Sequence, residues 1–171
     1  THSTEEMDHY LDSLEREMDL VAEHIGPGRD VFQLHLGGGT PNYLCPSQLG
    51  RLINMIGDRF RLLGDTDAAI ECNPRRLSPG QLELLRGLGF RRLSLGVQEL
   101  EPAVQRTIGR VQSLRMLQDI YWMARETGFE SINFDLVYGL LNQTEQGFQA
   151  TLEQVVDLAP DRVTCFSYAH A

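Results

Sequence analysis

The sequence predicts an α/β fold in which parallel strands with helices outside them form a partial barrel. Three observations support this prediction: helical and strand patterns alternate along the chain, one face of each strand is polar, and five strands are expected. Strands that alternate with helices favour a parallel sheet built from right-handed crossovers. A closed eight-stranded barrel needs about 250 residues. The 171 residues therefore predict only part of a barrel, in one domain over residues 1–171.

The helices are predicted from apolar residues that recur at intervals of three and four. The first extends from Ser3 to Ile25, begins with a capping box between Ser3 and Glu6, and ends before Gly26. Further helices are expected over residues 46–63, 78–88, 101–108, 113–127 and 144–158.

Five strands are expected over residues 30–36, 68–72, 91–97, 131–137 and 161–168. Alternate residues of a strand point to opposite faces, so each strand divides into two sets. We expect the bulky apolar set to lie beneath the helices: Phe32, Leu34, Leu36, Ile70, Cys72, Leu93, Leu95, Val97, Ile132, Phe134, Leu136, Thr164, Phe166 and Tyr168. The small polar set contains Gln33, His35, Ala69, Glu71, Asn73, Ser94, Gly96, Gln98, Asn133, Asp135, Cys165, Ser167 and Ala169.

The polar face of the strands predicts a wet lumen. A buried polar group without a partner costs about 1–3 kcal/mol, so a row of such groups needs water, partners or a ligand. A curved sheet with helices outside meets this need. An open sheet with one solvated face is the alternative, although such faces usually carry Lys and Glu.

In parallel barrels the chemistry lies at the carboxyl ends of the strands. Here these ends converge on one rim and consist of residues 37–41, 71–74, 96–98, 135–139 and 167–170, the last of which is His170. Three consecutive glycines, residues 37–39, allow backbone groups to approach a ligand closely. Their spacing fits neither a dinucleotide fingerprint nor a phosphate loop.

Each candidate side chain on this rim has two interpretations. Glu71 and Asp135 either accept from an amine or ribose hydroxyls, or form structural ion pairs with an arginine. Gln98 suits a carboxylate or an adenine edge. The planar fork of Arg110 either clamps a carboxylate or is solvated. We interpret His35 as a satisfied interior residue, because two histidines far apart in sequence make no metal motif.

Charge and cysteine content limit the function classes. A net charge of −9 argues against a protein that binds nucleic acid or an anionic membrane. Such binding depends on Lys and Arg side chains that neutralise phosphate groups. No stretch approaches the 18 or so apolar residues of a membrane span. Cys45, Cys72 and Cys165 fit no disulfide framework or metal motif, and a reducing cytosol is expected. Because the chain begins with Thr1, we expect it to be part of a longer protein.

Four segments at the strand ends, residues 35–41, 70–74, 93–98 and 134–139, together carry a family resemblance. In this order they resemble the radical S-adenosylmethionine superfamily and, within it, the oxygen-independent coproporphyrinogen III oxidases. The resemblance extends from the first helix to Ala171. The ending of residues 166–170 favours the oxidases over their haem-chaperone relatives, which share the glycine loop.

The resemblance implies a six-stranded partial (β/α) barrel that holds a 4Fe-4S cluster and two molecules of S-adenosylmethionine. It implies that Gly38, Gly39 and Thr40 contact the aminoacyl parts of both molecules, and that Glu71 holds the amine or ribose of the cluster-bound one. The second molecule's site would then be lined by Gln98, Arg110, Asp135 and Ala169.

The activity that the resemblance implies is the conversion of two propionates of coproporphyrinogen III to vinyl groups. The resemblance also implies a partner that donates electrons to the enzyme. The family's Cys-x3-Cys-x2-Cys loop is not in this chain, so we expect the first strand and that loop before Thr1, and a C-terminal domain after Ala171. This chain alone is therefore expected to be inactive. Two alternatives remain: a haem-binding chaperone with the same barrel, and a sugar- or nucleotide-binding module without redox chemistry.

Overall fold

The structure is a computed structural model that describes residues 3–169. Its α-helices are α1 (Thr4–Ile25), α2 (Pro46–Arg59), α3 (Pro79–Gly87), α4 (Pro102–Thr107), α5 (Leu114–Glu126) and α6 (Glu145–Asp157). Its strands are β1 (Asp30–Leu36), β2 (Arg61–Cys72), β3 (Phe90–Gln98), β4 (Ser131–Tyr138) and β5 (Arg162–Ser167). Two short 3-10 helices, η1 (Pro41–Tyr43) and η2 (Pro74–Arg76), follow β1 and β2.

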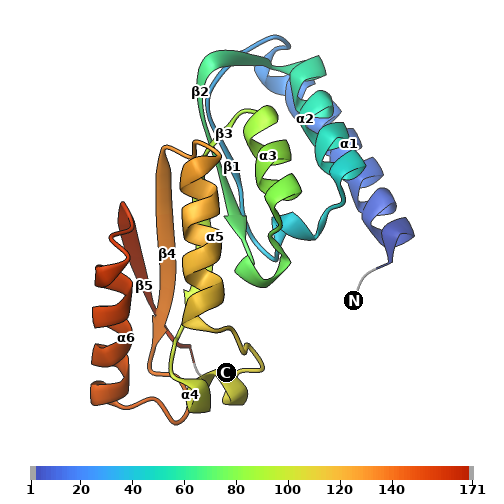
Figure 1. Ribbon diagram of the computed structural model, residues 1–171. Coiled ribbons are helices and arrows are strands. Elements are labelled where there is room, and N and C mark those ends of the chain that lie inside the picture. The colour runs from blue at the N-terminus through green and yellow to red at the C-terminus, as the bar shows by residue number, and fades with distance from the viewer. Residues whose placement is uncertain (1–2, 170–171) are drawn as a thin grey trace.

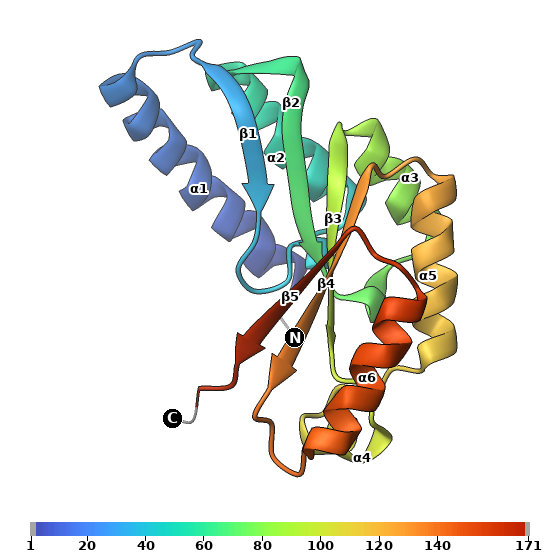
Figure 2. The ribbon, with the colours of Figure 1, turned by 90° about the vertical axis from the view of Figure 1, so that its left-hand side faces the viewer.

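The five strands form one parallel sheet in the order β1-β2-β3-β4-β5, so every pair is consecutive in the chain. The sheet is curled, and the helices lie on its outer side while the concave side carries none (Figures 1 and 2). The predicted partial barrel of parallel strands with outer helices is therefore confirmed. β1 and β5 are the two edge strands of the described sheet.

Side-chain caps explain where the helices begin. Ser3 and Glu6 form the predicted capping box at the start of α1. Ser78, Ser113 and Thr144 each accept a hydrogen bond from a backbone N–H in the first turn of α3, α5 and α6. Each cap satisfies one of the amide groups that a helix leaves without a partner at its N-terminus.

The core lies between the outer face of the sheet and the helices. The strands contribute buried residues of the predicted apolar set, and the helices contribute the leucine, isoleucine and alanine side chains that face them. The largest side chains with almost no exposure are Phe90, Phe134, Leu11, Leu49, Ile70, Leu82, Leu85, Leu93, Leu95, Leu117, Ile132 and Leu136. Among residues 3–169, no helix has the length and apolar character needed to cross a bilayer.

The boundary between α2 and β2 differs from the prediction. The helix ends at Arg59, four residues before the predicted end, and β2 begins at Arg61 instead of Ala68. Arg61 pairs with Asp30 and Leu62 with Val31, after which the register shifts before Asp67 meets Gln33. The apolar pair at 62–63 continues the helical periodicity of α2, but pairing with β1 draws these residues into the sheet.

The two faces of β5 are also the reverse of the prediction. Thr164 pairs with Asp135 and its hydroxyl donates to Asn133 Oδ1 at 3.0 Å, which places it on the polar, concave face. Phe166 has the same parity as Thr164, so it also faces the lumen. Cys165 and Ser167 lie on the other face. At an edge strand both faces are partly exposed, so residue size did not indicate which face is covered.

Candidate functional site

A cavity of about 290 Å³ lies at the carboxyl ends of the strands, on the concave side of the sheet. It brings together seven of the eight residues predicted for the site. Its lining consists of Gly38, Gly39, Thr40, Pro41, Glu71, Cys72, Asn73, Gly96, Gln98, Arg110, Asp135 and Phe166. The lining residues come from strands β2, β3, β4 and β5 and from the segments that follow β1, β2 and β3. The curl of the sheet brings these elements together and so creates the cavity.

The glycine loop after β1 forms one wall of this cavity. Gly38 has a φ of +99°, a backbone conformation that other residues rarely adopt. Gly37 is required for a different reason, because a Cβ there would lie 2.8 Å from both Glu71 Oε1 and His35 Nε2. The backbone N–H of Gly38 donates to Glu71 Oε2 at 3.2 Å. The loop therefore packs its bare backbone against the carboxylate of Glu71.

His35 does not line this cavity but contacts Glu71, which does. Its imidazole is 56% exposed and lies 3.1 Å from Glu71 Oε1, so the prediction of an interior position is wrong. The alternation along β1 did place His35 on the polar face together with Glu71. The predicted wet lumen already implied that a side chain on this face meets solvent, and the interior interpretation did not follow that implication.

Asp135 lies at the centre of a polar network on the concave face. Its Oδ2 accepts from Ser94 Oγ at 2.7 Å and its Oδ1 accepts from Asn133 Nδ2 at 2.7 Å. Burial raises the pKa of Asp135 above its ordinary value, while the hydrogen bonds from Ser94 and Asn133 oppose this shift. The carboxylate is thus held in one orientation and partly removed from water, facing the cavity.

Arg110 supplies the positive charge of the cavity. Its guanidinium lies over Gly96, since a Cβ on that glycine would be 3.0 Å from Arg110 Nη2. Arg110 Nε is buried and has no hydrogen-bond partner among the described residues. Burial lowers the pKa of Arg110, and the nearby Arg75 guanidinium lowers it further. An arginine nevertheless stays charged at neutral pH, so this group is an unpaired donor set directed into the cavity.

Gln98 occupies an unusual backbone conformation at the end of β3. Its φ is +66°, in the region that favours glycine. The N–H of Glu99 donates to the carbonyl of Val97 at 2.8 Å, which closes a three-residue γ-turn around Gln98. This turn places the amide of Gln98 next to Gly96, 3.0 Å from where a Cβ would stand.

Ala169 is the one predicted site residue that does not line this cavity. It is exposed and follows β5, where the backbone N–H of the preceding Tyr168 donates to Tyr138 O at 2.9 Å. Phe166 contributes to the lining from the same strand instead. His170 lies outside the described residues.

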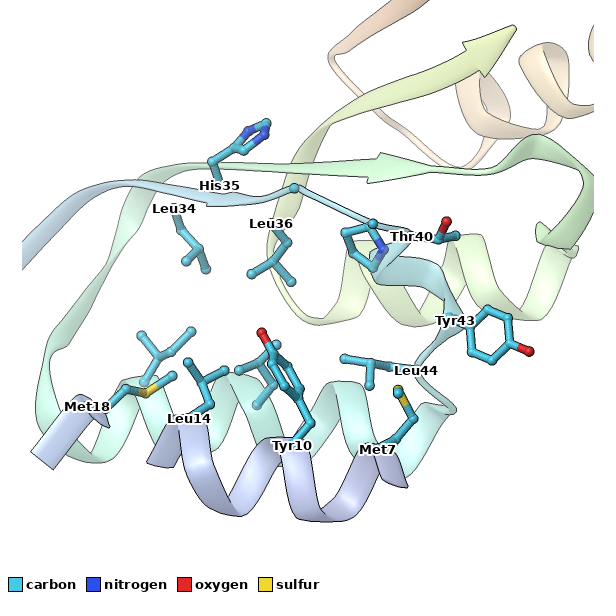
Figure 3. A pocket seen from close by; sticks show the side chains of 15 residues that line it. Met7, Tyr10, Leu14, Met18, Leu34, His35, Leu36, Thr40, Tyr43 and Leu44 are labelled. Atoms are coloured by element: carbon cyan, nitrogen blue, oxygen red, sulfur yellow. The ribbon is translucent and has the colours of Figure 1, made fainter. Parts of the chain in front are cut away.

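A second, larger cavity of about 910 Å³ lies between α1 and β1. Figure 3 shows Leu34 and Leu36 directed toward Leu14 and Met18 of α1, while His35 points away from them. Its lining is mostly apolar, and it reaches the glycine loop at Gly39 and Thr40. Phe32, on the same face of β1, is 71% exposed. The edge strand therefore has an apolar face that the helices cover only in part.

The cysteines form no site in the part of the chain that the structure describes. Cys72 is buried and Cys165 is exposed, and burial raises the pKa of the Cys72 thiol. The hydrogen bond between Cys45 and Ser47 lowers the pKa of Cys45. Over residues 3–169 no group of three His, Cys, Asp or Glu side chains could hold a metal ion.

The cavity at the strand ends can bind a ligand that carries charges of both signs. Glu71 and Asp135 can accept from an ammonium group or from hydroxyls, and Arg110 can donate two parallel hydrogen bonds to a carboxylate. Gln98 can donate and accept at once. Such a set matches a zwitterionic amino-acid moiety joined to a polar group.

Comparison with known proteins identifies the family of this chain. The family model described as the Radical SAM superfamily matches residues 2–155. Oxygen-independent coproporphyrinogen III oxidase from Escherichia coli is 43% identical over 170 residues, which cover 99% of this chain and 37% of that protein. The enzyme of the same name from Pseudomonas aeruginosa is 42% identical over 163 residues, 94% of this chain and 35% of that protein. The chain thus spans little more than a third of these relatives.

Solved structures show the same fold. The structure described as coproporphyrinogen III oxidase (HemN) from Escherichia coli, a radical SAM enzyme, superposes with a TM-score of 0.94 at 43% identity, covering all of this chain and 39% of that one. Elp3 from the archaeon Methanocaldococcus infernus superposes with a TM-score of 0.69 at 17% identity, covering 90% of this chain and 41% of that one. The second likeness concerns the fold alone.

Proposed function

Because this chain belongs to the radical SAM superfamily, we propose that it is the central barrel segment of an oxygen-independent coproporphyrinogen III oxidase. The cavity at the strand ends is then the binding site for S-adenosylmethionine. The observation that carries this proposal is the joint presence of Arg110, Glu71, Asp135 and Gln98 in one lumen. The curated relatives named for this activity share more than two fifths of the aligned residues.

The residues present fit S-adenosylmethionine. Its aminoacyl part carries one carboxylate and one ammonium group, and the cavity offers an unpaired guanidinium and two carboxylates. Gly38, Gly39 and Thr40 would contact the aminoacyl parts of two such molecules. Glu71 would hold the amine or ribose of the one bound to the cluster.

The second molecule's site would involve Gln98, Arg110, Asp135 and Ala169. Arg110 is the natural partner of its carboxylate, because a planar guanidinium matches a carboxylate with two parallel hydrogen bonds. Ala169 lies beyond the cavity lining, so any contact from it would be made at the open end of the lumen.

When bound, S-adenosylmethionine and a reduced 4Fe-4S cluster would supply a 5′-deoxyadenosyl radical, which takes one hydrogen atom from each of two propionates of coproporphyrinogen III. Loss of carbon dioxide and of one further electron from each propionate to an electron acceptor would give protoporphyrinogen IX, with methionine and 5′-deoxyadenosine as the other products. An electron donor would be the partner that reduces the cluster. The cysteines of this chain do not fit the cluster, because they lie far apart in sequence and Cys72 is buried. The protein's part is to place the cosubstrates and exclude competing reactions.

We further propose that a first barrel strand with the cluster-binding loop precedes this chain and that a C-terminal domain follows it. Two observations support the additional strand. β1 is an edge strand, and its apolar face, with Phe32, is only partly covered by α1. A parallel strand on that edge would pair the free backbone groups of β1 and fill part of the second cavity. The three cysteines, all free thiols, suit the reducing cytoplasm we propose as the compartment.

The replacement of Arg110 by Ala in the full-length protein tests this function. The expected result is a KM for S-adenosylmethionine raised about tenfold or more, from the loss of a charged hydrogen-bonding partner, with cluster content unchanged. Arg115→Ala is the matched control, because Arg115 is an exposed arginine whose partner is Asp119 on the same helix. An unchanged KM in Arg110→Ala argues against the assigned role. Tight haem binding without decarboxylation of coproporphyrinogen III would instead indicate the haem chaperone.

A further inference from the structure

Glu99 is a fully buried carboxylate directly after Gln98, and the proposed function assigns it no role. Its Oε1 accepts from the backbone N–H of Leu100 at 2.7 Å and of Glu101 at 3.1 Å, and from the hydroxyl of Thr151. Its Oε2 accepts from Gln143 Nε2 at 2.6 Å. All four of these partners are neutral donors, so Glu99 acts here only as an acceptor.

The partners of Glu99 join two loops of the rim. Gln143 Oε1 accepts from the backbone N–H of Gly139 at 2.7 Å and of Leu140 at 3.2 Å, and its Nε2 also donates to Val137 O at 3.0 Å. Gln143 thereby fixes the segment that follows β4. Its remaining contact, with Glu99, connects that segment to the end of β3.

The turn that Glu99 follows is strained. A non-glycine residue at the centre of a γ-turn with positive φ is in an unfavourable backbone conformation and persists only where the surroundings hold it. The pairing of β3 with β4 skips a residue at the same point, since Gly96 pairs with Asp135 and Gln98 with the next residue, Leu136. Such bulges redirect a side chain. Here the redirected side chain is Gln98, which lines the cavity.

The main chain of Glu99 also anchors the segment that carries Arg110. Gln105 Nε2 donates to Glu99 O at 2.8 Å and to Gln112 O at 2.8 Å. The backbone N–H of Arg110 donates to Gln105 O at 2.8 Å. Displacement of Glu99 would therefore move the supports of both Gln98 and Arg110.

We propose that Glu99 is a positioning residue whose buried carboxylate holds the strained turn and so directs Gln98 and Arg110 into the cavity. The identity of the ligand rests on the proposed function, but the support of the turn does not. Glu99→Gln is the sharpest change, because its amide keeps the shape of the side chain while one acceptor oxygen becomes a donor. That donor then faces the N–H groups of Leu100 and Glu101 on one side or the amide N–H of Gln143 on the other, and only the hydroxyl of Thr151 can rotate to accept from it.

In the full-length protein, we expect Glu99→Gln to bind S-adenosylmethionine about tenfold more weakly by calorimetry on the cluster-free form. The KM should rise more than kcat falls. Amide hydrogen exchange should become faster in residues 98–101 and 139–143, where the lost acceptor contacts lie. Glu99→Asp keeps a carboxylate near the N–H groups of Leu100 and Glu101, so we expect its affinity to lie between those of Glu99→Gln and wild type.

Ile132→Val is the control for a general loss of stability. Ile132 is fully buried near the opposite end of β4, so the loss of one methylene there lowers the stability of the fold. We expect this variant to melt at a lower temperature than wild type and to bind S-adenosylmethionine with unchanged affinity. Equal affinity loss in Ile132→Val and Glu99→Gln, or wild-type affinity and exchange in Glu99→Gln, would overturn the proposal.

Two further outcomes remain decisive. Should Glu99→Gln fail to fold, wild-type affinity and exchange in Glu99→Asp would overturn the proposal, because the shorter side chain cannot reach Gln143 in the same way. Absence of S-adenosylmethionine binding by the wild type would refute the proposed function instead. In that case, faster amide exchange at residues 98–101 in Glu99→Gln than in wild type would still support the role of Glu99 in holding the turn.

Discussion

The guanidinium of Arg110 occupies the space that a side chain on Gly96 would fill. A Cβ on Gly96 would lie 3.0 Å from Arg110 Nη2 and 3.0 Å from Gln98 Nε2. Gly96 has no positive φ, unlike Gly38, so the lack of a side chain is needed for space and not for backbone freedom. Because β3 has no side chain at Gly96, the guanidinium of Arg110, which comes from a later loop, can lie against the backbone of the strand there.

Gly96→Ala should shift the ends of Arg110 and Gln98 slightly and weaken the binding of S-adenosylmethionine, by less than the roughly tenfold expected for loss of a charged hydrogen-bonding partner. Calorimetry on the full-length protein measures this effect. Gly50→Ala is the control, because an added Cβ in α2 meets nothing within 4 Å and should stabilise the helix by about 0.5–1 kcal/mol. Equal affinity in the two variants would contradict the spatial explanation.

Asp135→Asn should stabilise the chain at neutral and alkaline pH. Because the folded-state pKa of Asp135 is raised, the protonated form favours folding and the stability falls as the pH rises through that pKa. An asparagine avoids this loss and can still accept from Asn133. We expect a melting temperature about 2 °C higher at about pH 8. The gain should shrink as the pH is lowered through the raised pKa of Asp135 toward the ordinary pKa of an aspartate, about 3.9.

The control for this pH effect is Asp119→Asn. Asp119 is an exposed carboxylate on α5 that pairs with Arg115. Its replacement should change the melting temperature by less than about 1 °C. A gain for Asp135→Asn that stays constant from about pH 8 down to the ordinary pKa of an aspartate, about 3.9, would show that burial of the charge is not its cause.

The 171-residue chain should assemble no stoichiometric 4Fe-4S cluster, because its three cysteines are too dispersed to share one. Anaerobic reconstitution with iron and sulfide, followed by iron analysis and electron paramagnetic resonance, measures this. Cys165→Ser, at the exposed cysteine, should leave the residual iron unchanged. A four-iron signal that disappears in this variant would refute the proposed location of the cluster ligands outside this chain.

The 171-residue chain should also associate with itself through β1. Phe32 is 71% exposed on this edge strand, and exposed apolar edges promote pairing between chains. Phe32→Lys should reduce association in sedimentation velocity over a range of concentrations. Val156→Lys, at a residue 67% exposed on α6, tests whether any added charge has the same effect. Equal reduction by both variants would show that β1 is not the contact.

Much of this fold could be predicted because each element has a strong local signal. Ser3 and Glu6 identify the start of α1, and the alternation along β3 separates Ser94 from Leu95. Such signals do not reveal where a strand begins when its first residues also suit a helix, as at Arg61. They do not reveal which face of an edge strand is covered, as at Phe166. Both errors arise where tertiary pairing overrides the local pattern.

The site was predictable where a residue type is itself informative. Glu71, Gln98 and Asp135 are polar groups at strand ends, and they line the same cavity in the structure as Arg110, which lies in the loop between α4 and α5. The residues that hold these side chains in position carry no such signal in the sequence. In the sequence Glu99 does not differ from other acidic residues. Its role is visible only in the structure, where Thr151 and Gln143, distant in the chain, donate hydrogen bonds to it.

The order of the strands in space is the same as their order in the chain. Each strand can therefore dock onto its predecessor as soon as it is synthesised, without waiting for distant segments to arrive. Folding of this region can proceed alongside translation, one βα unit at a time. The contacts of Glu99 with Gln143 and Thr151 form only after β4 and part of α6 have been made, so the rim around the candidate site should reach its final structure later than the sheet that supports it.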